Sequence, residues 1–271
     1  MISHLRAIGI TEAVEDSSGN AGAAMAAYAA RAGIHLKVFC PASAAAGKLA
    51  QIERYGATLV KIEGARPRAT EALLDYIKTT GAYYASHLWH PFFLEGLKTL
   101  AFEIAEARAW NPPDWILCPV GAGSILLGLY KGFSELQQAG IISNLPRLAA
   151  IQAKHISPVV SAFTNKTARV SPMLSPQPTL AEGIALPAPV RDREVLEALE
   201  KTQGSVAAVS EAEIKMATNA FGAAGFYVEP TSAVVLPGLK QLEKNGIISP
   251  TESVVLILSG HGLKAGAVDL S

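Results

Sequence analysis

Residues 13–33 have the sequence AVEDSSGNAGAAMAAYAARAG, which joins a short apolar pair, a polar turn and an alanine-rich run. Ala13-Val14 lies in a predicted short strand. Residues 21–32 are predicted to form a helix, and Gly33 is the residue type that most often ends one. This order of strand, turn and helix is typical of α/β proteins.

The same order repeats outward from this stretch, because short apolar runs alternate with longer helical patterns. In the first part of the chain we expect strands at 34–39, 57–62 and 83–86, and helices at 44–55 and 69–80. In the second part we expect strands at 115–118, 148–153 and 253–258, and helices at 92–108, 124–139, 193–201, 211–221 and 231–244. Residues 165–189 are rich in Ser, Thr and Pro and are expected to form a long loop.

Repeated strand–helix units predict parallel-type sheets covered by helices. We therefore expect a two-domain α/β fold with its boundary near residues 89–91. We expect residues 1–89 to form a smaller domain and residues 90–271 a larger one.

Composition narrows the class of protein. The 271 residues are 50% hydrophobic, and 23 basic residues balance 23 acidic ones. A neutral chain without a basic cluster argues against nucleic-acid binding. The longest apolar run, 21–30, is too short to span a bilayer, and the pattern after Met1 is not that of a signal peptide. Cys40 and Cys118 each end an apolar run and are expected to be buried, reduced thiols.

Three polar or glycine-rich turns follow predicted strands. Ser17-Ser18-Gly19-Asn20 opens a helix and could present N–H groups and hydroxyls to an anion, or could be an ordinary helix cap. Pro119–Ser124 places Gly121 and Gly123 before another helix, which suits a phosphate cradle or a tight turn. Residues 259–264 (SGHGLK) follow the last strand. Because ligands of open α/β sheets bind at the carboxyl ends of strands, the three turns together predict a phosphate-bearing ligand.

These residues also carry a resemblance to a known family. The chain resembles the fold type II pyridoxal-phosphate enzymes, whose fold is that of the tryptophan synthase beta subunit, and within them it is most similar to threonine synthase. The matching segments are SSGNAG at 17–22, AAYAARAG at 26–33, FLEGLKT at 93–99, PVGAGS at 119–124, EPTSA at 229–233 and SGHGLK at 259–264.

The resemblance implies pyridoxal 5'-phosphate as the cofactor and a role for each matching residue. Asn20 would bind the ring hydroxyl oxygen and Ser259 the pyridine nitrogen. Ser17, Ser18 and Ala21 would bind the substrate carboxylate. The cofactor phosphate would lie in a loop made of Gly121, Ala122, Gly123, Ser124 and Ile125. The smaller domain, with its asparagine loop, would close on the larger, cofactor-binding domain and exclude water.

The chain departs from the family in one respect. The family's lysine, which forms a Schiff base with the cofactor, lies in a Ser-Phe-Lys-Asp-Arg type segment before the asparagine loop. Here residues 1–8 resemble the rest of that helix, so the resemblance implies that residues 1–9 are the end of a helix of the larger domain. Lys48, Lys98 and Lys264 are not convincing replacements for the missing lysine. We therefore assign no catalytic residue and expect an N-terminally truncated chain: a fragment of a full enzyme, one part of a split enzyme, or a non-catalytic remnant.

The implied activity of the full-length form is a lyase of threonine biosynthesis that converts O-phosphohomoserine and water to threonine and phosphate. A threonine or serine dehydratase-like lyase is the alternative within enzymes. A non-catalytic protein that binds pyridoxal phosphate, another phosphate ligand or a partner subunit is the alternative outside them. We expect a cytoplasmic homodimer with an amino-acid substrate, without nucleic-acid or membrane partners. We expect no metal site, since His87 and His90 have no Cys or acidic cluster near them in sequence.

Overall fold

The computed structural model describes residues 1–44, 46–64 and 66–264. The chain divides into two compact units, Met1–Phe93 and Leu94–Ser271. None of the helices in the described ranges is both long enough and apolar enough to traverse a bilayer.

The first unit contains a four-stranded parallel sheet in the order β3-β2-β1-β4. Its strands are β1 (Glu12–Glu15), β2 (His35–Pro41), β3 (Thr58–Ile62) and β4 (Tyr83–Tyr84). Its helices are α1 (Ile2–Ala7), α2 (Asn20–Ala32), α3 (Ala46–Arg54) and α4 (Arg66–Thr80), followed by α5 (Phe92–Leu97), which crosses into the second unit. Gly33 ends α2 in the left-handed conformation at φ 71°, as glycine at this position permits.

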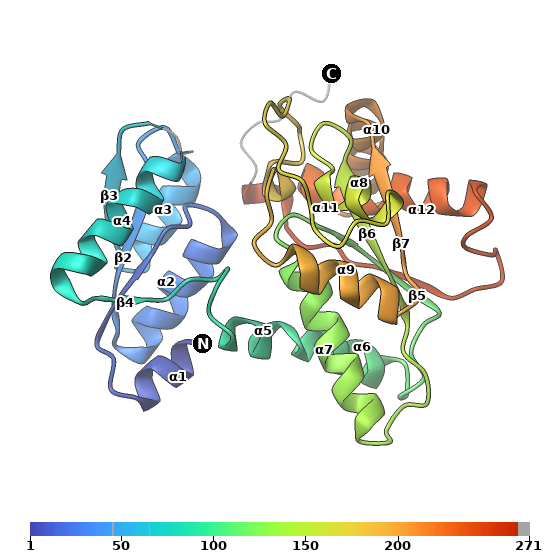
Figure 1. Cartoon of the computed structure of the whole chain (residues 1–271), viewed down its shortest axis with the longest axis horizontal. Coiled ribbons are helices and arrows are strands. Elements are labelled where there is room, and N and C mark those ends of the chain that lie inside the picture. The colour runs from blue at the N-terminus through green and yellow to red at the C-terminus, as the bar shows by residue number, and fades with distance from the viewer. Residues whose placement is uncertain (45, 65, 265–271) are drawn as a thin grey trace. The chain divides into compact units, whose positions relative to one another are not determined.

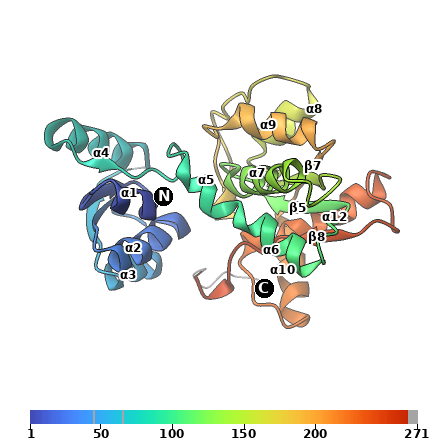
Figure 2. The same ribbon diagram turned by 90° about the horizontal axis from the view of Figure 1, so that it is seen from below.

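Alternation of side chains along the strands gives this sheet two apolar faces. On one face Ala13, Leu36 and Val38 pack with buried residues of α1, α2 and α3. On the other, Val14 and Phe39 pack with Leu73 of α4. Figure 2 shows α4 on the side of this unit opposite α2 and α3. Residues 1–9, expected in the larger domain, pack in the first unit, where Leu5 of α1 is buried.

The second unit contains another four-stranded parallel sheet, in the order β7-β6-β5-β8. Its strands are β5 (Trp115–Pro119), β6 (Arg147–Ala153), β7 (Ser205–Val209) and β8 (Val254–Leu256). Its α-helices are α6 (Thr99–Ala107), α7 (Ser124–Gln138), α8 (Pro158–Thr164), α9 (Asp192–Lys201), α10 (Glu211–Ala223), α11 (Pro230–Ala233) and α12 (Val235–Lys244). Two 3-10 turns, η1 (Glu182–Ile184) and η2 (Gly262–Lys264), complete the unit (Figure 1).

This sheet is also covered on both faces. Ile116 and Cys118 of β5 face a core that includes buried residues of α6, α7, α8 and α9. Trp115 and Leu117, which point the other way, face a core that includes Ile214 of α10 and Leu242 of α12. The predicted class, parallel sheets covered by helices, is confirmed in both units.

Three sequence predictions need correction. The single helix expected at 92–108 is two helices, α5 and α6, because the chain tightens at Lys98, where Ala101 N–H donates to Lys98 C=O three residues back. The helix expected at 231–244 is divided between α11 and α12. Pro237 has no N–H for the Ala233 carbonyl, so the α-helical hydrogen-bond series is interrupted there. The edge strand β7 was not predicted at all.

Both cysteines are buried, Cys40 in the first unit and Cys118 in the second. Burial raises the pKa of the Cys118 thiol to about 12, and burial also raises the pKa of Cys40. Only the thiolate is a good nucleophile. We expect neither thiol of the folded chain to react with a disulfide reagent at pH 8, and both to react in denaturant, as counted by thiolate release. Rapid native labelling of Cys118 would contradict its placement in the core.

Candidate functional site

In each sheet the first strand of the unit has later strands on both of its sides, so the direction in which strands are added reverses there. In the first unit β2 and β3 extend the sheet on one side of β1, and β4 lies on the other. In the second unit β6 and β7 extend one side of β5, and β8 lies on the other. Ligands of open α/β sheets bind at the carboxyl ends of strands where the order reverses. The turns after β1, β5 and β8 therefore lie at the ligand-binding edge of their own sheets.

The turn after β1, residues 16–19, leads directly into α2. Gly19 N–H donates to Ser17 Oγ at 3.3 Å, and the first helical hydrogen bond runs from Ala23 N–H to Gly19 C=O. The helix has no side-chain cap, and within the described ranges the N–H groups of residues 20–22 have no partner. A thirteen-residue helix thus presents unpaired donors at its positive end, a suitable arrangement for an anion.

Close packing fixes this turn in place. A Cβ atom on Gly22 would lie 1.8 Å from Ser17 O, so only glycine fits there. Ser17 is 7% exposed, Ser18 and Ala21 are half-buried, and Asn20 is exposed. The carboxamide of Asn20 is therefore accessible to a ligand.

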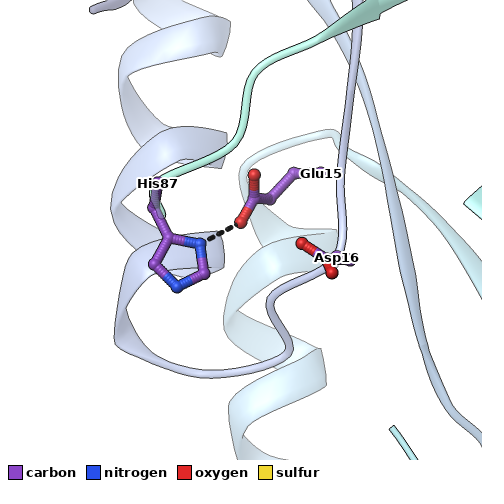
Figure 3. A group of neighbouring side chains, drawn as sticks. All are labelled: Glu15, Asp16 and His87. Carbon is purple, nitrogen blue, oxygen red and sulfur yellow. Dashed lines mark hydrogen bonds and ion pairs between the residues drawn. The ribbon is translucent and has the colours of Figure 1, made fainter. Parts of the chain in front are cut away.

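Two buried acidic residues lie at the last position of β1 and at the first position of this turn (Figure 3). Asp16 accepts hydrogen bonds from Thr70 Oγ1 at 2.7 Å and from Tyr84 Oη at 3.0 Å. Glu15 Oε1 lies 2.5 Å from His87 Nδ1. Burial raises the pKa of Glu15, and the hydrogen bond from His87 opposes this shift. These contacts tie the end of β1 to α4 and to the segment after β4.

The turn after β5 is held by a buried amide. Gln152 Nε2 donates to Val120 C=O at 2.9 Å, while Gln152 Oε1 accepts the N–H groups of Val159 and Val160. Gln152 was not identified from the sequence, although it is the single polar residue in the apolar strand expected at 148–153 and was therefore a usable signal. Its hydrogen bonds fix the position at which the chain leaves β5.

Two glycines allow the next residues to approach their neighbours closely. A Cβ on Gly121 would lie 2.9 Å from Ile184 Cα. Gly123 has φ +82° and caps α7, and a Cβ there would lie 2.2 Å from Val195 Cγ2. α7 has no side-chain cap, and in the described part of the chain no partner is found for the N–H groups of residues 121–126.

Ser259 follows β8, the strand that pairs with β5. Ser259 Oγ lies 3.1 Å from Ser232 Oγ, which also accepts the Gly260 N–H at 2.7 Å. The neighbouring Thr231 Oγ1 accepts the N–H of Gly183. Since residues 183–184 also contact Gly121, a continuous set of contacts joins the turn after β5 to Ser259.

The remaining candidates from the sequence have other contacts. His261 is exposed, stacks edge-on against Tyr227 and accepts the Leu263 N–H. His90 shares a hydrogen bond with Tyr83 Oη at 2.9 Å, whereas His87 faces Glu15, so the two histidines have different partners. The Lys98 ammonium pairs with Glu95 at 2.6 Å and with Glu135 at 2.8 Å.

These ion pairs make Lys98 a poor nucleophile. The hydrogen bonds of Lys98 to Glu135 and, to a smaller extent, to Glu95 raise its pKa. An amine that attacks a carbonyl needs a lowered pKa instead. The side chains of Lys48 and Lys264 lie outside the described residues. Of the three lysines considered from the sequence, the described residues therefore test only Lys98, and its ion pairs support its rejection.

The segment expected as a long loop, 165–189, contains only η1 as regular structure and is anchored by Asp192. Asp192 accepts hydrogen bonds from Arg169 Nε at 2.9 Å and from Val170 N–H at 2.8 Å. Burial alone would raise the pKa of Asp192, but these hydrogen bonds lower it below its ordinary value.

We expect Asp192→Asn to lower the free energy of unfolding by about 1–3 kcal/mol at pH 7. Because the folded pKa is depressed, the contribution of the carboxylate is present above about pH 4 and is lost as the pH falls through the folded value. The difference in urea unfolding between parent and variant should therefore be largest at pH 7 and should shrink as the pH falls below about 4. A difference that does not change with pH would show that the charge has no role.

A comparison with protein-family models assigns the chain to a family. Residues 1–260 match the model of the family described as "Pyridoxal-phosphate dependent enzyme". The chain belongs to this family of pyridoxal-phosphate-dependent enzymes.

Among curated relatives, the chain is similar to threonine synthases. It is 38% identical to that of Methanocaldococcus jannaschii over 250 residues, 92% of this chain and 61% of the relative. It is 36% identical to that of Methanosarcina acetivorans over 267 residues, 95% of this chain and 65% of the relative. The chain thus spans less than two thirds of the length of these two proteins.

Solved structures confirm the fold. The processed form of threonine deaminase isoform 2 from Solanum lycopersicum superposes with a TM-score of 0.78 at 17% identity, covering 93% of this chain and 66% of that one. Maize serine racemase gives a TM-score of 0.79 at 20% identity, covering 94% and 74%.

The described residues fit the cofactor of this family. A phosphate needs several N–H donors and a close backbone approach, and residues 121–126 offer unpaired N–H groups beside two glycines. A hydroxyl can donate a hydrogen bond to a pyridine nitrogen. Ser259 is exposed after β8, the strand that pairs with β5.

Proposed function

We propose that this chain carries the cofactor- and substrate-binding parts of a threonine synthase-like lyase, which converts O-phosphohomoserine and water to threonine and phosphate. The identity to two threonine synthases supports this choice of substrate. The observation that carries the proposal is the start of α7, which has no side-chain cap and whose N–H groups have no partner in the described part of the chain. It lies at the strand end adjacent to that of β8.

When bound, pyridoxal phosphate supplies an electron-withdrawing ring for lyase chemistry. Gly121, Ala122, Gly123, Ser124 and Ile125 bind its phosphate through the positive end of α7. Ser259 donates its hydroxyl to the ring nitrogen and leaves that nitrogen without a full positive charge. Ser232 restrains the Ser259 hydroxyl, since their oxygens are 3.1 Å apart.

In this proposal the residues of the first unit have the roles that the family resemblance implies. Asn20 donates its amide to the ring hydroxyl oxygen. Ser17, Ser18 and Ala21 receive the substrate carboxylate at the positive end of α2, where the N–H groups of residues 20–22 are unpaired in the described ranges. The nucleophilic and proton-moving amine required by the full reaction is assigned to no residue of this chain.

The proposal is tested by ligand binding to the full chain. We expect pyridoxal phosphate to bind at one equivalent, and O-phosphohomoserine to perturb the absorbance of the bound cofactor more than threonine or serine does. Borohydride reduction followed by peptide mapping should give no stoichiometrically modified lysine, Lys98 included. Phosphate release should be negligible.

Two outcomes would redirect the assignment. If threonine or serine changes the absorbance of the bound cofactor more than O-phosphohomoserine does, the dehydratase-like alternative is favoured. The fold of this chain is similar to that of a threonine deaminase. Binding of pyridoxal phosphate without any amino-acid response favours a non-catalytic binding protein. The homodimer and the cytoplasmic location expected from the family likeness remain part of the proposal and are testable by light scattering and cell fractionation.

A further inference from the structure

Three side chains near the start of the turn at 16–19 are not used by the proposed function. Glu15 is the last residue of β1, Asp16 is the first residue of the turn, and His87 follows β4. One ligand-capable atom from each lies within 4.8 Å of the others. Figure 3 shows the Glu15 carboxylate between the His87 ring and Asp16. All three belong to the first unit, so the group is complete within one compact body.

The charges in this group do not balance. Glu15 is 0% exposed and Asp16 is 4% exposed, whereas His87 is the one group of the three that can carry a positive charge. Both oxygens of Asp16 accept from neutral hydroxyls, those of Thr70 and Tyr84. No ion pair from a lysine or arginine to either carboxylate is found among the residues that the structure describes. Two buried carboxylates with one imidazole leave negative charge uncompensated, which is costly away from water.

An unpartnered oxygen points to a missing ligand. Glu15 Oε2 is fully buried and has no hydrogen-bond partner, while Oε1 of the same carboxylate faces His87. Buried carboxylate oxygens are normally satisfied by donors or by a cation. A proton shared between Glu15 and His87 would give Oε1 a hydrogen bond but would leave Oε2 without a partner. A cation can instead be bound by either oxygen of Glu15 or by both.

We propose that Glu15, Asp16 and His87 bind one divalent transition-metal ion, zinc by ligand chemistry. An imidazole nitrogen with two carboxylates is a donor set that zinc accepts, and the nitrogen disfavours magnesium and calcium, which prefer oxygen ligands. A charge of 2+ neutralises both carboxylates. With bonds of about 2.0–2.2 Å, ligand atoms on one zinc lie about 3.3–3.6 Å apart, so the Nδ1···Oε1 contact opens to admit the ion.

Such an ion would act on the neighbouring turn. It would join the end of β1 to the segment after β4 at the residue that precedes Ser17. The group would then be a structural metal site beneath the turn at 16–19, separate from the residues assigned to cofactor and substrate.

Zinc itself is the probe. The full chain is stripped with a chelator, dialysed and titrated with zinc chloride by calorimetry, without pyridoxal phosphate, so that the result does not depend on the proposed function. We expect one zinc per chain, weakened at least about 100-fold in Glu15→Gln and in His87→Gln, because changes even outside the direct ligands weaken binding 10–100-fold. His35→Gln, which alters an exposed histidine on β2, should bind as the parent does.

Each other outcome overturns the proposal. If the parent binds no zinc, Glu15 and His87 form an ion pair only. If both variants keep the parent affinity, the zinc lies elsewhere. If the variants do not fold, X-ray absorption of the zinc-loaded parent decides: one nitrogen and carboxylate oxygens support the site, and sulfur or several imidazoles exclude it. Excess magnesium should not displace the zinc.

Discussion

Ser124→Asp should weaken the binding of pyridoxal phosphate at least about 100-fold while leaving the fold intact. Ser124 is the first residue of α7, where unpaired N–H groups are proposed to bind the cofactor phosphate. A carboxylate at about 4 Å from another negative charge repels it by about 4 kcal/mol near a protein surface, more than a 100-fold change in affinity requires. Equilibrium titration followed by absorbance measures the effect.

The same substitution is favourable for the helix. An acidic residue in the first turn stabilises a helix by about 0.3–1 kcal/mol, so the melting temperature should be unchanged or higher. Ser124→Asn is the matched control, because asparagine has the size of aspartate without its charge. It should keep most of the parent's affinity for pyridoxal phosphate. Equal affinity in the parent and in a folded Ser124→Asp chain would mean that residues 119–124 are only a tight turn. Gly123→Asp is a less suitable variant, because its Cβ would contact Val195 at 2.2 Å.

The turns could be predicted from the sequence because their signals are local. Gly121 and Gly123 follow an apolar run and precede a helical pattern, which places them at a strand end without knowledge of the rest of the fold. The same holds for residues 17–20. Most of the strands could also be predicted from local signals, since a short apolar run alternates with a segment of helical period.

Tertiary contacts could not be predicted in this way. His87 and Glu15 are 72 residues apart and meet only because β4 pairs with β1 across a crossover. Ser232 and Ser259 meet because α11 packs beside the residues after β8, and no spacing rule indicates this. The strand β7 was missed because its sequence, SVAAV, is short and lies between two stronger helical patterns. Its pairing with β6 gives it strand structure.

Gly22→Ala should lower the free energy of unfolding more than an alanine at any other described glycine of the first unit, because its added Cβ meets the shortest contact. The added Cβ would lie 1.8 Å from Ser17 O and 2.9 Å from Ser17 C, and both are backbone atoms that cannot rotate away. Either α2 or the turn at 16–19 must move. Overpacking typically costs about 1–3 kcal/mol, and a backbone clash this close should reach about 3 kcal/mol or more. Urea unfolding of the full chain measures the loss.

Gly222→Ala is the matched control. Gly222 lies within α10, and nothing is within 4 Å of the position that its Cβ would occupy. Alanine in place of glycine inside a helix should raise the free energy of unfolding by about 0.5–1 kcal/mol, because glycine loses more backbone entropy on folding. The two variants thus make the same chemical change, but the free energy of unfolding should fall in Gly22→Ala and rise in Gly222→Ala. If Gly22→Ala were as stable as Gly222→Ala, the close packing of α2 on the turn at 16–19 would be wrong. The proposed geometry of the carboxylate-binding residues would then lose its support.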